Sequence, residues 1–529
     1  MRNRLPVFAS ACVASLVTAF TPAHAELTRL EVASKQPYGS FRAGEFVIWQ
    51  GKVHGELSPQ ESIPGLDKVQ RNARGKVEYA ARFVLIMPAE AGRGNGTLLV
   101  DIPNRGNAYA LALYNSPRDE PFQSGTLEQG TGFLQDQGFS LAEVSWELGR
   151  GADLPTFVDA EGKTRYVEGV GFAIVRDTAD FLAHGSADAA STANPLKGAV
   201  VRTLASGKSQ SGRFLKSFLL RGFNMASGRR VFDAMQIFVS GWGSMPIMQT
   251  STGPESSANG IPTFDDPEMR GENEDPLAIA DLLARVQARG EPAPKVMFVN
   301  STTDFYARRV SLGRTGPSGT VERALPANAR MYDIAGASHV IAARAPQSCK
   351  LAAGRLDWAP VSRALLLRLN DWVATNAEPP ASVLMPLEAA APDAALKAPS
   401  YFSGAVIQVP KHDADGNALG GVRLPEQAAP LGTNGGLNEP TSRECMLVGA
   451  YKAFAANKAQ REAAGDSRLS IAERYRNRDD YVNRIRVAAR ELMQQGFLLP
   501  EDAAVIIQAA ASNAALKQAP AARPLELLR

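Results

Sequence analysis

The strongest chemical signal in the sequence is a serine in a turn of small residues. Residues 199–215 have the pattern of an apolar strand, a short turn around Ser209 and a helix. A serine nucleophile at such an elbow occupies a strained turn, so the residues two before and two after it must be small. Gly207 and Ser211 meet this requirement. The helix that follows would direct N–H groups toward a developing oxyanion, so we predict that Ser209 is a nucleophile.

Two other interpretations of this segment are weaker. Ser211 is the competing nucleophile, but the residue two positions after it is the bulky Arg213. The letters Gly-Lys-Ser at 207–209 also resemble the end of a phosphate-binding loop. Arg202 stands where that motif needs its first glycine, so the phosphate loop is excluded.

A serine nucleophile needs a base, and His339 is the best placed histidine. The sequence has five histidines, of which His24 lies in the leader described below. His54 and His412 fall in turns, and His184 ends a predicted helix, where a cation has a structural purpose. His339 follows a late apolar strand in a loop of small residues. We predict that His339 takes the proton of the serine.

The base needs an acid that orients its ring, and Asp304 is predicted for this role. Where the chain order is serine, acid and histidine, the acid lies between the other two and just after a strand. Asp304 follows the apolar run at 295–299. The rival carboxylates are those of Asp265, Asp266 and Asp333.

Acyl transfer also requires two N–H donors for the oxyanion. One is expected from Gln210, the residue after the nucleophile. The second should come from the loop after an earlier strand, at Arg105 or Gly106, where glycine lets the backbone approach a substrate. The alternative is an ordinary Pro/Gly loop. Trp146 and Tyr306 are candidate pocket residues, although each could equally belong to the core.

No metal and no cofactor is expected. The segment 413–417 contains Asp413 and Asp415 and invites a calcium interpretation. Its glycine is misplaced for an EF-hand loop, and Leu424 stands where the last Glu should be, so we predict a turn. The sequence lacks the zinc-protease, C-x-x-C and dinucleotide-binding motifs.

The elements that must position these residues alternate between strand and helix. The predicted strands are 97–102, 140–144, 199–205, 234–240, 295–299 and 330–334, and the predicted helices are 171–182, 210–220 and 361–374. Such alternation implies a doubly wound, mostly parallel sheet that is covered by helices on both faces. Residues 26 to about 100 form a β-rich segment before it.

The composition is that of an ordinary globular protein, and the chain is predicted to have three parts. These are the leader described below, an α/β domain and a C-terminal extension. Its 529 residues are 45% hydrophobic and 21% charged, which excludes collagen-like, disordered and disulfide-dense proteins. We predict an α/β domain over 26–375, in which 243–290 is either a lid or a surface excursion. Residues 376–529 form a mostly helical extension, with a strand at 401–409, a capping box at Ser470 that opens a helix, and helices at 480–495 and 501–516.

Residues 1–25 have the features of a secretory signal peptide. Arg2 and Arg4 precede the apolar stretch 5–20, and small residues stand at 23 and 25. The stretch is shorter than the roughly 20 residues that a membrane span needs, and no later stretch would span a membrane after cleavage. We therefore expect a secreted or periplasmic protein.

The predicted export bears on the pairing of the cysteines. Cleavage removes Cys12, and the remaining Cys349 and Cys445 can form one disulfide or stay as two thiols.

The 57 Lys and Arg against 54 Asp and Glu give a net charge of +3, which argues against a nucleic-acid partner. The oligomeric state is left open.

With these residues placed, the chain resembles an exported α/β-hydrolase-domain family of bacteria. The matching segments are 104–107, 138–139, 144–146, 171–177, 207–213, 302–304, 363–366, 415–417, 421–425 and 470–475. The resemblance implies an α/β-hydrolase fold with a serine-hydrolase triad, and it implies that residues 376–529 belong to the same unit. The elbow also resembles that of glucuronoyl esterases. Those enzymes carry Arg after the nucleophile and this chain has Gln210, so a uronate ester does not follow.

We expect a secreted serine hydrolase that cleaves a small-molecule carboxylic ester through an acyl-enzyme. Ser209 would attack, His339 would move the proton and Asp304 would orient the imidazole. The alternatives are a peptidase or amidase that uses the same triad, and a binding protein on a hydrolase fold that has lost catalysis.

Overall fold

The computed structural model describes residues 26–118, 123–243, 245, 247–248, 250–253, 277–341, 346–390, 405–439, 445–513 and 516. The predicted signal peptide lies outside these residues, as does 254–276, which is about half of the candidate lid at 243–290. None of the described helices has the length and hydropathy needed to cross a membrane.

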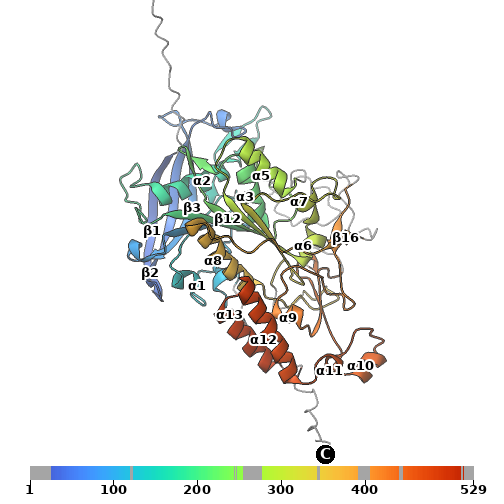
Figure 1. Cartoon of the computed structure of the whole chain (residues 1–529). Coiled ribbons are helices and arrows are strands. Elements are labelled where there is room, and N and C mark those ends of the chain that lie inside the picture. Colours follow the sequence, from blue (N-terminus) through green and yellow to red (C-terminus); the bar gives the residue numbers. More distant parts are fainter. Residues whose placement is uncertain are drawn as a thin grey trace, which may run out of the picture.

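A mixed sheet of ten strands forms the centre of the molecule (Figure 1). Its order is β1-β2-β3-β5-β4-β9-β12-β14-β15, and β6 pairs with β3 at one side. The strands are β1 (Glu26–Phe41), β2 (Gly44–Leu57), β3 (Val77–Pro88), β4 (Thr97–Asp101), β5 (Ser140–Val144), β6 (Ala152–Asp153), β9 (Arg202–Lys208), β12 (Ala234–Phe238), β14 (Lys295–Ser301) and β15 (Ala329–Ile334).

The six strands from β5 to β15 run parallel, whereas β1, β2 and β3 pair antiparallel with their neighbours. Every residue of β4 and β12 is buried, which explains why these strands read as continuous apolar runs. The mostly parallel sheet with an antiparallel N-terminal part is the predicted architecture.

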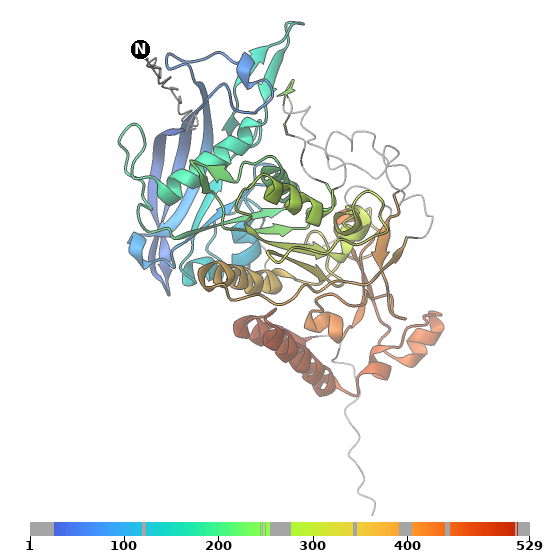
Figure 2. The ribbon, with the colours of Figure 1, turned by 45° about the horizontal axis from the view of Figure 1, so that its top comes forward.

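Helices cover both faces of the sheet and make two hydrophobic cores. One core contains α2 (Val170–His184), α3 (Gln210–Leu220) and α5 (Ile279–Ala288). The other contains α8 (Ala359–Thr375), α12 (Arg478–Gln495) and α13 (Pro500–Ser512). Neighbouring residues of β4 point to opposite faces of the sheet, so Leu98 packs in the first core and Leu99 in the second. Figure 2 shows α8 and the α12–α13 pair on the side of the sheet opposite α3 and α5.

Shorter elements connect this framework. The helical ones are η1 (Leu66–Lys68), η2 (Ala91–Arg93), η3 (Leu111–Asn115), α1 (Phe133–Asp136), α6 (Thr302–Ala307), α7 (Ser311–Thr315), α9 (Pro425–Ala428), η6 (Cys445–Leu447), α10 (Lys458–Ala463) and α11 (Ile471–Arg474). The short strands are β7 (Thr156–Val158), β8 (Thr164–Val167), β10 (Met225–Ala226), β11 (Arg229–Arg230), β13 (Thr250–Ser251), β16 (Leu387–Ala389), β17 (Gln408–Pro410), β18 (Gly432–Gly435) and β19 (Ala450–Ala453).

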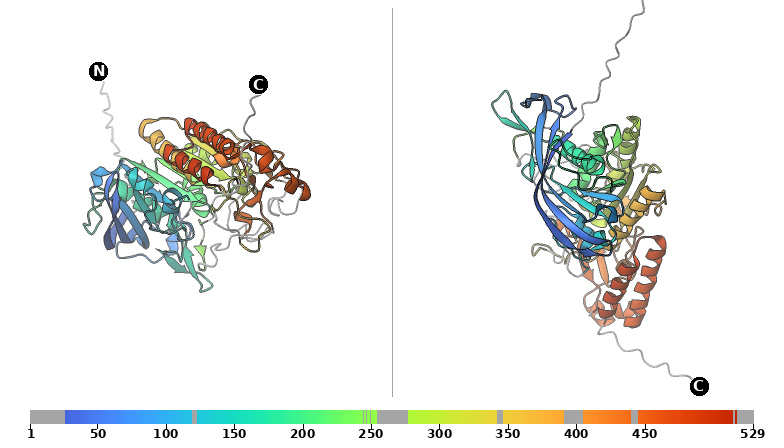
Figure 3. Two further views of the ribbon diagram at one scale, coloured as in Figure 1. Left: turned by 90° about the horizontal axis from the view of Figure 1, so that it is seen from below. Right: turned by 90° about the vertical axis from the view of Figure 1, so that its left-hand side faces the viewer.

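The C-terminal region packs directly on the sheet and on α8 (Figure 3). Bridges join Tyr332 to Val383 and Ile334 to Val422, so the extension continues the edge of the sheet beyond β15. The guanidinium of Arg363 on α8 pairs with the carboxylate of Asp502 on α13, and both residues are buried. Disruption of either residue would leave an unpaired buried charge.

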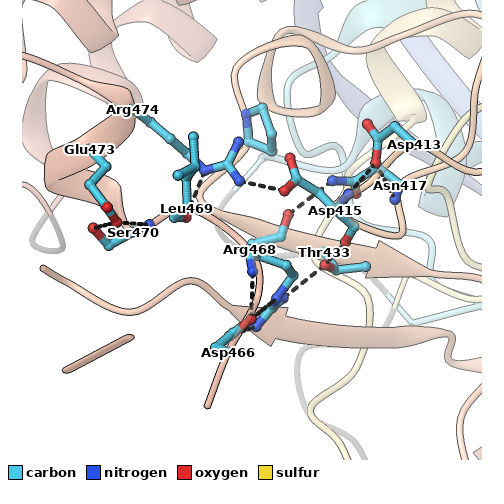
Figure 4. Close-up of polar contacts among 12 residues, drawn as sticks. Asp413, Asp415, Asn417, Thr433, Asp466, Arg468, Leu469, Ser470, Glu473 and Arg474 are labelled. Atoms are coloured by element: carbon cyan, nitrogen blue, oxygen red, sulfur yellow. Dashed lines mark hydrogen bonds and ion pairs between the residues drawn. The ribbon is translucent and has the colours of Figure 1, made fainter. Parts of the chain in front are cut away.

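A polar network fixes the turn at 413–417 against the C-terminal helices (Figure 4). The Asp413 carboxylate accepts from the backbone N–H groups of Asp415 and Asn417, each at 2.9 Å, and Asp415 pairs with Arg474. The predicted turn is confirmed. The capping box of Ser470 is also present, but the helix after it, α11, has only four residues.

Two further helix predictions in the C-terminal region hold with small shifts, and one strand prediction does not. The helices predicted at 480–495 and 501–516 correspond to α12 and α13. The strand predicted at 401–409 is wrong over most of its described length, because only β17 (Gln408–Pro410) pairs there, with β16.

Candidate active site

Ser209 lies at a sharp turn between β9 and α3. Its backbone has φ 55° and ψ −113°, in the positive-φ region that residues with side chains seldom adopt. The Ser209 N–H donates to the Phe238 carbonyl of the neighbouring β12 at 2.9 Å, and this bond holds the turn to the sheet. Such strain is stored where surrounding structure enforces it, and it is typical of a nucleophile elbow.

The small residues around Ser209 are required by close backbone approach. A Cβ atom on Gly207 would lie 2.6 Å from the Ser211 carbonyl oxygen, and one on Gly212 would lie 2.9 Å from the Ser240 Cβ. The hydroxyl of Ser211 is buried and bonds to the backbone N–H and carbonyl of Lys208, at 2.9 and 3.0 Å. Ser211 thus closes the turn, and its hydroxyl is not presented beside His339.

The structure brings Ser209, His339 and Asp304 together. His339 Nε2 lies 3.0 Å from Ser209 Oγ, and His339 Nδ1 lies 2.6 Å from Asp304 Oδ1. The three residues follow β9, β15 and β14, so they meet at the carboxyl edge of the parallel strands. This arrangement can pass a proton from the hydroxyl to the imidazole while the carboxylate holds the ring.

Asp304 is positioned by the first turn of α6. Its second oxygen, Oδ2, accepts from the Ser301 N–H at 3.0 Å and from the Ser301 hydroxyl at 2.6 Å. Burial opposes the ionisation of Asp304. The adjacent imidazole and these hydrogen bonds outweigh that cost, and the pKa of the carboxyl lies below its usual value. The side chain is therefore an anion that faces His339.

His339 is held as a neutral imidazole. The residue is only 3% exposed. Burial lowers its pKa below 6.5 despite the opposing effect of Asp304, and the positive charges of Arg308 and Lys208 lower it further. A neutral imidazole is the form that can accept the proton of Ser209.

The loop that carries His339, residues 335–341, is supported from distant parts of the chain. The Trp358 indole N–H donates to the Ser338 carbonyl at 3.1 Å, and the Val340 N–H donates to the Leu447 carbonyl at 3.1 Å. A disulfide joins Cys349 to Cys445, whose Cα atoms are 5.4 Å apart. We call residues 335–341 the histidine loop.

Asp333, one of the three rival acids, does not occupy the position beside His339. Asp333 is fully buried, and it accepts from Asn300 at 2.9 Å and from the Met385 N–H at 3.0 Å. Arg314 also pairs with it, at 3.3 Å. Asp333 thus ties the sheet edge to the C-terminal region. Asp265 and Asp266 lie outside the described residues.

The predicted oxyanion loop lies against both sides of the nucleophile. Asn104 Nδ2 donates to the Lys208 carbonyl at 2.6 Å, and the Arg105 N–H donates to the Gln210 side-chain oxygen at 2.8 Å. Arg105 and Gly106 both have positive φ, 51° and 78°. The Arg105 N–H is thus engaged by Gln210, whereas no acceptor among the described residues takes the Gly106 N–H.

The two candidate pocket residues are both buried. Trp146 is 2% exposed, packs against Phe214 with the two rings tilted by 44°, and donates from its indole to the Pro103 carbonyl at 2.8 Å. Tyr306 is 8% exposed, and its hydroxyl lies 3.2 Å from His412 Nε2. Trp146 supports the oxyanion loop from beneath, and Tyr306 contacts the C-terminal region.

Two residues near the site were not predicted from the sequence. The Lys208 ammonium is buried 4.1 Å from the centre of the Tyr109 ring and 5.3 Å from that of Trp358. Glu147 accepts a 2.8 Å hydrogen bond from the Gln210 side chain. Lys208 stands beside Ser209, and Glu147 lies three residues after β5, so their positions were signals, but their contacts are formed between distant segments.

No metal centre is visible in the described part of the chain. No group of three or more His, Cys, Asp or Glu side chains among those residues could hold a metal ion.

Similarity to solved structures is remote in sequence. Esterase B from Lactobacillus Rhamnosis is 12% identical, with 54% of this chain and 75% of that chain covered and a TM-score of 0.25. A putative acetyl xylan esterase from Bacteroides fragilis is 11% identical, with 57% and 70% covered and a TM-score of 0.26. The glucuronoyl esterase from Solibacter usitatus is 13% identical, with 53% and 71% covered and a TM-score of 0.25.

A family model gives the closer assignment. No curated protein matches this sequence. The model described as "Alpha/beta hydrolase domain" matches residues 55–508, from β2 to α13. This range includes the strands and loops that carry Ser209, Asp304 and His339, together with nearly all of the described C-terminal region. The predicted family is confirmed, and the chain belongs to the alpha/beta hydrolase domain family.

Proposed function

We propose that this protein is an exported serine hydrolase that cleaves carboxylic esters of small molecules. The observation that supports the proposal most is the hydrogen-bonded series from Ser209 Oγ through His339 to Asp304, with 3.0 and 2.6 Å steps. A strained elbow and two buried partners hold this series.

In the proposed reaction, Ser209 Oγ attacks the ester carbonyl while His339 Nε2 accepts its proton. Asp304 keeps the Nδ1–H tautomer and stabilises the imidazolium that forms. The imidazolium then gives the proton to the alcohol oxygen, which leaves as the alcohol and yields an acyl-serine. Water, deprotonated by His339, attacks the acyl-serine. The imidazolium then returns the proton to Ser209 Oγ as the bond to the acyl carbon breaks and the carboxylic acid is released.

The negative oxygen of the tetrahedral intermediate needs fixed donors. The first is the Gln210 backbone N–H, at the start of α3. For the second we propose the Gly106 N–H, since the neighbouring Arg105 N–H donates to the Gln210 side chain at 2.8 Å. Removal of one oxyanion-hole donor typically costs about 100- to 1,000-fold in kcat.

Export is part of the proposal. The disulfide between Cys349 and Cys445 supports it, because such bonds persist in oxidising compartments. Residues 1–25 have the composition of a signal peptide.

The function is tested by assaying the purified protein with a p-nitrophenyl ester of a short acid and with the matched anilide. We expect turnover of the ester that exceeds turnover of the amide, and a loss of roughly 10,000-fold or more in Ser209→Ala. Ser211→Ala is the matched control: it removes a hydroxyl two residues away that bonds within the turn, so its loss of turnover should be far smaller than that of Ser209→Ala.

Two outcomes would contradict the proposal. Full turnover by Ser209→Ala would exclude Ser209 as the nucleophile. Faster turnover of the amide than of the ester would favour an amidase or peptidase on the same residues.

A further inference from the structure

The side chain of Gln210 makes two hydrogen bonds that the proposed reaction does not use. Its Nε2 donates to Glu147 Oε1 at 2.8 Å, and its Oε1 accepts from the Arg105 backbone N–H at 2.8 Å. Gln210 is 2% exposed and Glu147 is 5% exposed. The side chain thus links the loop after β5, the elbow and the loop after β4 in a buried series.

The orientation of the Gln210 amide is determined by its partners. The Arg105 N–H can only donate, so it must face the amide oxygen. The amide nitrogen then faces Glu147, which has an oxygen that accepts. The opposite orientation would place the amide N–H groups against the backbone N–H. Each contact therefore enforces the other.

The Arg105–Gly106 turn needs such support. Both residues have positive φ, and for Arg105, which has a Cβ atom, this conformation is uncommon. The Gln210 oxygen holds the N–H of Arg105, and Trp146 holds the Pro103 carbonyl just before it at 2.8 Å. Without the amide, the peptide before Arg105 would lose its hydrogen bond inside a buried site.

Glu147 is a suitable anchor because it is fixed in a closed environment. It lines a cavity of about 20 Å³ together with Gln210, Glu168 and Trp146. Oxygen Oε2 of Glu147 and oxygen Oε1 of Glu168 are buried in it without a protein partner. A cavity of this size has room for about one water molecule, which could satisfy both oxygens and leave Oε1 of Glu147 for Gln210.

We propose that Glu147 and the Gln210 side chain are positioning residues, which hold the Arg105–Gly106 turn so that its Gly106 N–H serves as the second oxyanion donor. The inference rests on the proposed function, since it names how that site keeps its donor in place. Neither side chain touches the reacting atoms. Their effect falls on the transition state, where the oxyanion develops, so kcat falls while KM changes little.

The test measures kcat and KM on the same short p-nitrophenyl ester for Gln210→Met, Glu147→Leu and the double variant. Methionine fills the space of glutamine, keeps the backbone N–H and removes both side-chain bonds. We expect kcat to fall about 10- to 100-fold in each single variant and KM to stay within about threefold. The double variant should be no worse than the single ones, because residues that act as one unit are not additive.

Two further variants separate positioning from folding. Glu147→Gln keeps an acceptor for Gln210 and should retain kcat within about threefold of the parent. Glu168→Gln, in the same cavity but without a bond to Gln210, should leave kcat unchanged. Thermal unfolding of every variant shows whether it is folded at the assay temperature. If Glu147→Leu does not fold, the kcat values of Glu147→Gln and Gln210→Met are compared instead.

The inference is overturned if folded Gln210→Met keeps kcat within about threefold, if only its KM changes, or if the double variant loses the product of the two single losses. Each of these results would leave the esterase proposal intact, because the parent enzyme and Ser209→Ala would still differ. If the parent itself has no esterase activity, the proposed function fails and the positioning role fails with it.

Discussion

The elbow at 207–212 and the histidine loop at 335–341 present the side chains of Ser209 and His339, but they are built in different ways. The elbow combines contacts within the turn, those of the Ser211 hydroxyl and of the close approach at Gly207, with the bond from the Ser209 N–H to the Phe238 carbonyl. The histidine loop is held by Trp358, 20 residues after Ser338, and by Leu447, which lies farther along the chain. The small residues that allow the Ser209 turn are thus a local pattern of the sequence, whereas the position of His339 depends on contacts from outside its loop.

The largest expected effect is the loss of turnover when His339 is replaced. His339→Gln should lower kcat by roughly 10,000-fold, because no other base stands beside Ser209 Oγ in the described structure. The melting temperature should change little, since the substitution preserves much of the side-chain volume. Steady-state kinetics with thermal unfolding measures both quantities. Retention of more than a tenth of the parent kcat would contradict the role of His339.

The next effect concerns the elbow. Gly207→Ala would place a Cβ atom 2.6 Å from the Ser211 carbonyl oxygen, closer than backbone atoms tolerate. A shift of about 1 Å in Ser209 is enough to lower turnover roughly 100-fold. Gly92→Ala is a control of the same chemistry at a glycine that, like Gly207, does not have a positive φ, and there the added Cβ meets nothing within 4 Å. Equal kcat values for the two variants would refute the claim that the elbow is fixed by backbone contact.

The elbow could be predicted from the sequence because its signals are local. The apolar strands and the small residues around Ser209 are local patterns, so the parallel sheet and the placement of Ser209, Asp304 and His339 at its carboxyl edge followed from them. The contacts of Glu147 with Gln210 and of Leu447 with Val340 join distant segments, and no local pattern encodes them.

Tertiary contacts also explain the weaker predictions. The capping box at Ser470 predicted a helix, but α11 ends after four residues at Tyr475, which is extended and buried. The Tyr475 hydroxyl donates to the Pro430 carbonyl at 2.8 Å, and this packing ends the helix. The sequence also could not tell whether Trp146 and Tyr306 line a pocket or lie in the core, because the burial of each side chain depends on neighbours from other segments.

A third effect concerns the disulfide between Cys349 and Cys445. Replacement of both Cys349 and Cys445 by Ser should lower the free energy of unfolding by about 2–4 kcal/mol, since the bond closes a loop with a sequence separation of 96. At a temperature where the variant is folded, kcat should fall less than about tenfold, because Trp358 still holds Ser338. Denaturant unfolding and steady-state kinetics measure the two effects. An unchanged unfolding midpoint would show that the disulfide does not support this region.

The smallest expected effect is a shift in pH dependence. The pKa of His339 lies below 6.5 because of burial, so kcat/KM should be constant above 6.5 and fall as the pH drops through the lowered value. His339 in the unfolded chain binds its proton at higher pH than in the folded protein. Its contribution to stability is therefore complete above 6.5 and is lost as the pH falls toward the lowered pKa.

Lys208→Gln tests the source of part of that shift. The Lys208 ammonium lowers the pKa of His339, so its removal should move the acidic limb of the kcat/KM profile to higher pH. The control is Lys197→Gln, which removes a positive charge from an exposed position. A limb that stays in place in Lys208→Gln, or that moves equally in both variants, would exclude an electrostatic effect of Lys208.

The most direct measurement of the central claim is the site of covalent modification by a fluorophosphonate, located by mass spectrometry of the digested protein. The account predicts one adduct per chain, on Ser209, and almost no labelling in His339→Gln, because the hydroxyl needs the imidazole to react. An adduct on Ser211 or on another serine, or no adduct on folded protein that turns over esters, would contradict it.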